Sequence, residues 1–459
     1  MKYESYLSEI DRNAEEICSV SDAIWSYAET AFDEYDSMRT LTAALERHGF
    51  TVERGIAGMP TAFRATYGSG KPAMGILAEY DALSGLNQEG NATEPRPRPN
   101  VPDTGHGCGH NLFAGGSFAA ALAVRRYVEE TGHGSVTLFG CPAEENGGGK
   151  VFLARAGVFN DIDAVVSWHP ERMYMVRTRP SLANVSVLYR FTGIAAHAGG
   201  SPHRGRSALD AVELMNIGVQ FLREHMETTC RIHYAILDSG GEAPNVVQSH
   251  AAVRYLIRAE TNRAAAELRE RVENIARGAA LMTDTHYESE LVAGDSNLIM
   301  IPTLQQTAYE AMQDIPLPTP TEEDIAFGQA LQATMTLTDA QKRAPLYPER
   351  VLPPAPPVAH GGSTDTSDVS WNCPTVQMHI GTWCEGTPGH SWQAVAQGTS
   401  HYAKKAMLYA GKAVASTILR VIESPERLAQ VKREHAERTA GGYVCPIPDT
   451  LLPEIRPER

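Results

Sequence analysis

The chain lacks the excess of positive charge that binding to nucleic acid or to an anionic membrane requires. Its 40 Lys and Arg residues are outnumbered by 55 Asp and Glu residues, which gives a formal net charge of −15. It also lacks any apolar run near the roughly 18 residues that span a bilayer, and residues 1–10 lack the apolar segment of a signal peptide. We therefore expect a cytoplasmic protein with neither a nucleic acid nor a membrane as its partner.

Cysteine is scarce, and its spacing shows no disulfide pattern. The seven cysteines are odd in number and scattered through 459 residues, which favours reduced thiols. Aromatic residues make up only 7% of the chain, whereas apolar residues make up 42% and charged residues 21%. These proportions are typical of a globular protein, and the length predicts two domains rather than one core.

Short buried strands alternate with helices along much of the chain. Apolar runs predict strands at 73–80, 135–141, 164–168 and 375–380. Helical patterns cover 11–49, 111–130, 302–314, 321–335 and 401–422. This alternation predicts an α/β sheet, in which functional side chains gather where the strands end.

The middle of the chain has a different order of predicted strands and helices. Within 183–295 the predicted order is strand, helix, strand, strand, helix, strand, which is the ferredoxin-like α+β pattern. We therefore predict an inserted domain over 183–295. The catalytic domain would then consist of a first part, 1–182, and a second part, 296–459.

Two candidate metal ligands lie in a glycine-rich segment. Cys108 and His110 are two positions apart, and Gly107 and Gly109 allow a close approach of the backbone. Thiolate and imidazole are ligands that zinc and similar divalent ions accept, and a thiolate can bridge two ions. Two alternatives remain at this point: a buried cysteine beside a structural histidine, or a nucleophilic cysteine with a histidine base.

Further candidates follow predicted strands. Glu144 and Glu145 precede a run of three glycines, and His169 ends the next strand. Glu145 is suited to ligate, while Glu144 takes a proton from the attacking water and passes it to a leaving amine; the chemistry alone also permits the opposite order. His390 lies in a Gly/Pro loop, and it is a candidate because two ions would need a fifth ligand.

A last set of polar residues is suited to holding a substrate. His197 could donate a hydrogen bond to an oxyanion, or it is an ordinary loop histidine. Arg258 could bind a carboxylate through two hydrogen bonds or neutralise an acid of the inserted domain, and Asn245 lies near an apolar strand. Gly361 and Gly362 could form an anion-binding nest of backbone amides or a plain turn.

In their order, these motifs resemble those of the M20 family of metallopeptidases, in particular its amidohydrolase branch. The matches cover nearly the whole chain: Cys108 to His110, Glu144, Glu145, His169, 196–198, Asn245 and His390. The segments 144–170, 79–83 and 363–365 are most similar to family members that act on aminobenzoyl-glutamate.

The resemblance implies a di-metal catalytic domain with an inserted lid and dimerisation domain. The reaction would be hydrolysis of the amide bond of an N-acyl amino acid, such as p-aminobenzoyl-glutamate. The implied ligands of two divalent ions, zinc or manganese and possibly cobalt, are Cys108, His110, Glu145, His169 and His390.

The resemblance also implies roles for the remaining candidates. Glu144 would be the general base, and His197 would reach the oxyanion, in relatives often across a dimer into the neighbouring site. The residues implied to hold the substrate are Asn245, Arg258, Gly361 and Gly362. Homodimerisation through the lid is implied as well, and a related second subunit is compatible with it.

Two departures from the family pattern bear on the acyl group. Many relatives have Asp where this chain has Asn111, which changes the charge expected near the ions, and many have Pro where it has Gln248. The rival enzymes are a dipeptidase and an indoleacetyl-amino-acid hydrolase on the same scaffold. The alternative that is not an enzyme is a non-catalytic partner subunit. The complete set of ligands and base argues against this alternative.

Overall fold

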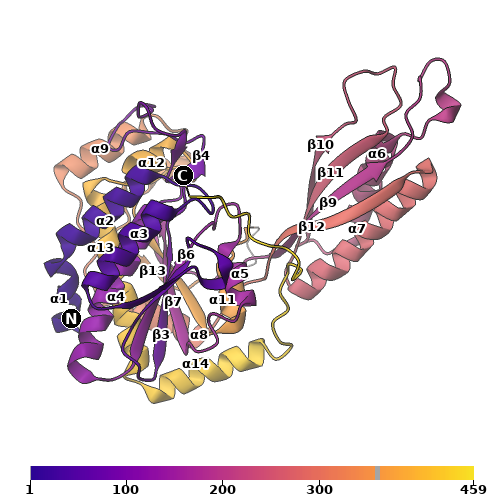
Figure 1. Cartoon of the computed structure of the whole chain (residues 1–459). Helices are drawn as coiled ribbons and strands as arrows, with labels where there is room; N and C mark the ends of the chain where they lie inside the picture. The colour runs from indigo at the N-terminus through magenta and orange to yellow at the C-terminus, as the bar shows by residue number, and fades with distance from the viewer. Residues whose placement is uncertain (1, 357–361, 459) are drawn as a thin grey trace.

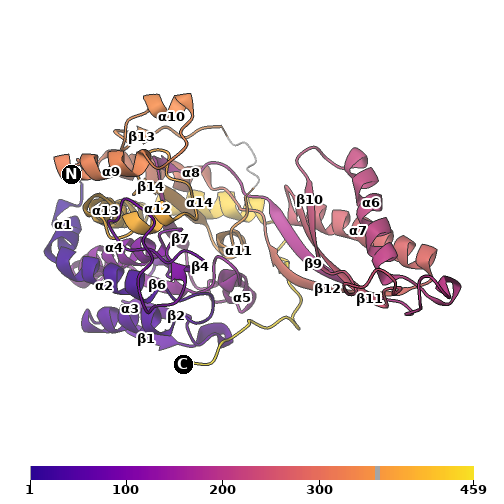
Figure 2. The same ribbon diagram turned by 90° about the horizontal axis from the view of Figure 1, so that it is seen from above.

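Two separate sheets organise the computed structural model, which describes residues 2–356 and 362–458. The larger sheet has eight strands in the order β1-β2-β6-β3-β7-β14-β8-β13, and the smaller has four in the order β10-β11-β9-β12. Helices surround the larger sheet, whereas the smaller sheet projects to one side with α6 and α7 (Figures 1 and 2). None of the described helices has the length and apolarity that crossing a membrane requires.

The larger sheet has a parallel centre. Its strands are β1 (Thr51–Arg54), β2 (Phe63–Tyr67), β3 (Ala73–Glu79), β6 (Ser135–Cys141), β7 (Ala164–Glu171), β8 (Tyr174–Val176), β13 (Val351–Leu352) and β14 (Thr375–Gly381). β6, β3, β7 and β14 run parallel, whereas β2 is antiparallel to β6. The four parallel strands are those predicted from the apolar runs. Because they are parallel, their carboxyl ends meet at one edge of the sheet.

Helices lie around this larger sheet. They are α1 (Glu4–Arg12), α2 (Ala14–Tyr27), α3 (Tyr35–Arg47), α4 (His110–Thr131), α5 (Gly149–Arg155), α8 (Pro302–Gln313), α9 (Glu322–Gln332), α10 (Asp339–Arg343), α11 (Thr366–Asn372), α12 (Trp392–Gln397), α13 (His401–Ile422) and α14 (Pro425–Arg438). A Cβ added at Gly116 of α4 would lie 2.5 Å from the Trp168 ring. This close packing fixes the helix that begins at His110 against the strand that carries His169.

The helical pattern predicted over 11–49 is divided among three helices. α2 ends at Tyr27 because Ala28 takes a left-handed conformation, with φ of 47°. A loop then leads to α3. A minor ribbon, β4 (Leu83–Ser84) with β5 (Thr104–Gly105), lies just before the Cys108 segment.

The smaller sheet has its own core. Its elements are β9 (Ala183–Thr192), α6 (Ala208–Leu222), β10 (Arg231–Asp238), β11 (His250–Ala259), α7 (Asn262–Thr283) and β12 (His286–Asp295). Both helices pack on one face of this antiparallel sheet. The order of elements is the predicted ferredoxin-like one, and the mixed α/β class of the whole chain is confirmed. The domain limits at 182/183 and 295/296 stay a prediction.

Candidate active site

The candidate ligands lie at the carboxyl edge of the larger sheet. Glu79 ends β3, and Glu144 and Glu145 follow β6. His169 lies in the last part of β7, and His390 belongs to the loop after β14. The parallel topology therefore collects residues from distant parts of the chain, as expected for this class of sheet.

Three groups of described side chains have the spacing of metal ligands, and two of these groups share Cys108. The ligand atoms of Cys108, His110 and His169 lie within 4.8 Å of one another, and the same holds for Cys108, Glu145 and His390. Cys108 Sγ is 3.4 Å from His169 Nε2. Glu145 Oε2 is 3.4 Å from His390 Nε2. A thiolate common to both groups is suited to bridge two ions.

The candidate ligands His110 and His169 are each oriented by a contact at the other ring nitrogen, Nδ1. His110 Nδ1 lies 2.8 Å from Asp81 Oδ1, and His169 Nδ1 lies 2.7 Å from the Pro170 carbonyl oxygen. Such contacts select the tautomer that leaves Nε2 as a ligand. His110 Nε2 and Glu145 Oε1 are buried and have no hydrogen-bond partner among the described residues. Because buried polar atoms are rarely left unpaired, the residues present fit a bound metal.

The adjacent carboxylates Glu144 and Glu145 differ in proton affinity. Burial raises the pKa of Glu144 well above its usual value, and the charges of Glu79 and Asp365 raise it further. Burial also acts to raise the pKa of Glu145, but its hydrogen bond with His390 and nearby positive charge lower it to about 2. The more basic carboxylate is the better proton acceptor, so this difference favours Glu145 as a ligand and Glu144 as the base.

The thiol of Cys108 is a poor nucleophile in these surroundings. Burial raises the pKa of Cys108 above its usual value, and burial lowers the pKa of His169. Both shifts oppose a thiolate–imidazolium pair between Cys108 and His169. The pKa of His110, however, is raised by the charges of Asp81, Cys108 and Glu79, although burial acts to lower it. A divalent cation, in contrast, stabilises the thiolate that binds it.

Backbone strain accompanies two of the loops that form this edge. Ala143, which precedes Glu144, has φ of 59°, and His390 has φ of 53°. Residues other than glycine adopt such values rarely, and they do so most often at functional sites.

Four residues of this network, Glu79, Asp81, Lys150 and Asp365, lay outside the predicted set. Asp81 orients His110, and Lys150 contacts Glu79 Oε1 at 2.7 Å and Asp365 Oδ1 at 2.6 Å. Two signals were present in the sequence: Asp81 follows a buried strand closely, and Lys150 is a charged residue beside the apolar run 151–154.

The side chain of Asn111 forms hydrogen bonds that join neighbouring elements. Its side-chain amide donates hydrogen bonds to Ser21 Oγ at 3.1 Å and to the Gly398 carbonyl oxygen at 2.9 Å. The residue therefore ties α4 to α2 and to the end of α12.

Arg258 and Gly362 lie together where the two sheets are joined. Arg258 Nη1 donates a hydrogen bond to Ser363 Oγ at 2.9 Å, and Leu182 N donates one to the Gly362 carbonyl oxygen at 3.2 Å. Thr364, which follows Ser363, donates a hydrogen bond to Glu144 Oε1 at 3.2 Å. The predicted Gly361 lies outside the described residues.

His197 and Asn245 are placed at the other end of the smaller sheet. Their loops are joined by a hydrogen bond from Ala198 N to the Asn245 carbonyl oxygen at 2.9 Å. The ten residues of β9, at about 3.3 Å each, separate this end from the junction, and both figures show the loops beyond β9 at the tip of the projection. The structure does not bring these two residues to the ligand cluster.

The tautomer of His197 follows from its own loop. Its Nδ1 accepts hydrogen bonds from Gly199 N at 3.2 Å and Gly200 N at 3.0 Å. In a neutral ring the proton is then on Nε2. His197 is exposed, so this N–H can donate to an incoming group.

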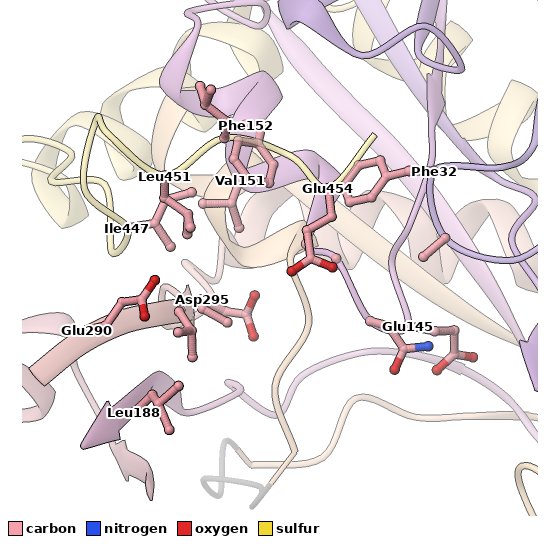
Figure 3. Close-up of a pocket in the computed structure, with 18 of the residues that line it drawn as sticks. Phe32, Glu145, Val151, Phe152, Leu188, Glu290, Asp295, Ile447, Leu451 and Glu454 are labelled. Carbon is pink, nitrogen blue, oxygen red and sulfur yellow. The ribbon is translucent and has the colours of Figure 1, made fainter. Parts of the chain in front are cut away.

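A cavity of about 640 Å³ adjoins the Glu144–Glu145 loop. Figure 3 shows its walls: Leu188 and Glu290 come from the smaller sheet, and Ile447 and Leu451 come from the C-terminal segment. A volume of this size holds a small organic molecule.

Comparison with known proteins decides the family. Residues 75–391 match the model of peptidase family M20/M25/M40. The chain belongs to this family. It is 41% identical to a p-aminobenzoyl-glutamate hydrolase subunit of Escherichia coli (strain K12), over 97% of each chain. It is 32% identical to the Xaa-Arg dipeptidase of Mus musculus, over 93% of this chain and 90% of the other.

The same family supplies the matching fold. A dinuclear metal-binding M20 peptidase of Bacillus subtilis superposes with a TM-score of 0.60 at 16% identity, covering 90% of this chain and 99% of that one. The prediction of an M20-type hydrolase is therefore confirmed.

Proposed function

We propose that this M20 hydrolase cleaves the amide bond of an N-acyl amino acid, with p-aminobenzoyl-glutamate as the first substrate to test. The observation that carries the proposal is the pair of ligand groups sharing Cys108, with Glu144 directly beside them. The similarity over 97% of the length of a p-aminobenzoyl-glutamate hydrolase subunit supports the choice of substrate.

The proposed ligands of two divalent ions are Cys108, His110, Glu145, His169 and His390. Bound ions would supply Lewis-acid chemistry, polarising the scissile carbonyl and making water more acidic. Glu144 takes the proton of the attacking water and delivers it to the leaving nitrogen. The mixed sulfur, nitrogen and oxygen donors accept zinc, manganese or cobalt.

The substrate is held from the junction of the two sheets. Arg258 binds the carboxylate of the amino-acid part, and Gly362 adds backbone contacts. His197 donates its Nε2–H to the oxyanion, and Asn245 holds the substrate beside it. His197 and Asn245 reach the substrate only if the 183–295 domain closes or if a second chain supplies them.

We propose a homodimer formed through the 183–295 domain. Strand β10 lies at the edge of its sheet, and its apolar residues Tyr234, Ile236 and Leu237 are exposed. Edge strands of this kind readily pair with another chain. A related second subunit is the alternative, since the E. coli relative is named as a subunit.

A dipeptidase is the second candidate function. The cavity is lined by the acidic side chains of Asp295 and Glu454 and by Glu290, which is paired with Arg190. Such groups suit a basic side chain, and the M. musculus relative is named an Xaa-Arg dipeptidase.

The test is hydrolysis by the purified, metal-loaded chain. The panel contains p-aminobenzoyl-glutamate, indoleacetyl-aspartate, N-benzoyl and N-acetyl amino acids, and dipeptides with and without C-terminal Arg. Cleavage that a chelator abolishes supports the proposed reaction, and the preferred compound identifies the acyl pocket. A metal-loaded chain inactive on every compound would instead favour a non-catalytic subunit or one that needs its partner.

A further inference from the structure

Lys150 is a charged side chain with no access to solvent. Its side chain is 0% exposed, and its ammonium lies 2.7 Å from Glu79 Oε1 and 2.6 Å from Asp365 Oδ1. Burying an ammonium is unfavourable unless it is paired with good geometry, and such pairs rarely add net stability. A gain in stability therefore does not explain why this buried ion pair lies beside the ligand cluster.

The first partner, Glu79, has oxygens with different surroundings. Oε1 accepts the Lys150 ammonium, whereas Oε2 is buried, has no hydrogen-bond partner among the described residues, and lies 3.1 Å from His110 Nε2. Nitrogen and oxygen ligands lie about 2.0–2.2 Å from a zinc ion. Two atoms separated by 3.1 Å can thus reach the same ion. Glu79, His110 and Glu144 also form a group with ligand spacing.

The second partner, Asp365, connects Lys150 to the other side of the Glu144 loop. Asp365 Oδ2 accepts a hydrogen bond from Lys150 N at 3.0 Å. The preceding residue, Thr364, donates to Glu144 at 3.2 Å. One ammonium therefore joins the end of β3, the start of α5 and the segment before α11, and all three border the ligand cluster.

We propose that Lys150 is a positioning residue whose ammonium holds Glu79 with its second carboxylate oxygen toward the ion bound by His110. Glu79 is then a sixth protein group at the metal centre, beyond the five candidate ligands. The inference rests on the proposed function because it requires a bound ion. Its consequence is that a residue touching neither ion sets the affinity for one of them.

The measurement is the Zn²⁺ affinity of the metal-free chain, obtained by competition with a chromophoric chelator. In Lys150→Met, which keeps the length of the side chain without its charge, the affinity of one site should fall about 10- to 100-fold, as for other residues that orient metal ligands. The kcat should fall while KM changes little. Glu79→Gln should show the same loss, and the double variant should lose no more than either single one.

A matched control is Lys432→Met, which removes an ion pair with Asp163. Asp163 precedes β7, at the opposite edge of the sheet from the ligands. This variant should keep the Zn²⁺ affinity of the original chain. Thermal unfolding in the presence of chelator shows whether each variant is folded.

The outcomes separate the two proposals. An original chain that binds no Zn²⁺ contradicts the proposed function. An original chain that binds Zn²⁺, with Lys150→Met of equal affinity or with additive losses in the double variant, overturns the positioning role. If Lys150→Met does not fold, Glu79→Gln decides alone, and unchanged affinity in that variant overturns the inference.

Discussion

The ligand cluster and the His197 loop are held in contrasting ways. At the carboxyl edge of the larger sheet, His110 and His169 are fixed by contacts of 2.8 and 2.7 Å to groups behind them. At the tip of the smaller sheet, His197 and Asn245 are exposed and their loops are joined mainly to each other. In the proposed function, the metal-binding half of the site is thus formed within the larger sheet, and the oxyanion half has to be brought to it.

This contrast indicates which step each half controls. Groups in fixed positions can bind ions and move a proton without rearrangement, because their orientation is set before the substrate arrives. Residues at the end of a projecting sheet act only after domain closure or association with a second chain. Variants in the two halves should therefore differ in their effect on metal content and in their dependence on protein concentration.

The largest effect is expected for Glu144→Gln. An amide of the same size cannot accept a proton, so turnover should fall by about 10²- to 10⁴-fold, the usual contribution of general acid–base catalysis. Metal content, measured by elemental analysis, should stay unchanged. Glu437→Gln, at an exposed carboxylate of α14, is the control and should keep most of the activity. A Glu144→Gln enzyme of nearly normal rate would show that the base is another residue.

The next effect is expected for Cys108→Ser. Because Sγ belongs to both ligand groups, the change should lower the occupancy of both ions. Elemental analysis after dialysis measures the loss, and Cys18→Ser, a half-buried thiol of α2, is the control. Unchanged metal occupancy would favour the alternative in which Cys108 is a nucleophile. In that case a thiol-specific alkylating reagent, and not a chelator, should inhibit the enzyme.

His197→Ala tests the other half of the comparison. Loss of one oxyanion donor should lower kcat by about 10²- to 10³-fold while both ions stay bound. If the histidine acts on a neighbouring chain, mixing this variant with Glu144→Gln should restore part of the activity. Two inactive chains that remain inactive when mixed would favour closure within one chain. His203→Ala, in a nearby exposed turn, is the control.

The sequence was sufficient for the parts of the site that follow from local pattern. Apolar runs located β3, β6, β7 and β14, and a polar residue after a buried strand pointed to Glu144 and His169. The role of Lys150 could not be predicted in this way, because its partners Glu79 and Asp365 are distant in the chain and meet only through the sheet order. The long helical pattern at 11–49 failed for a different reason, since a single left-handed residue, Ala28, ends a helix without a glycine or proline.

Arg258 lies between the two halves, and the smallest effect is expected for its replacement. Its guanidinium bonds Ser363 at the junction, so it can hold a carboxylate whatever the position of the His197 loop. Arg258→Gln should raise KM by about tenfold or more for a substrate with a free carboxylate, since a charged hydrogen bond contributes about 1.5–3 kcal/mol. The KM of the corresponding carboxamide should change little. Arg263→Gln, whose guanidinium is paired with Glu267 at 2.8 Å, is the control. An equal rise for the carboxylate and the carboxamide would show that Arg258 supports the junction and not the substrate.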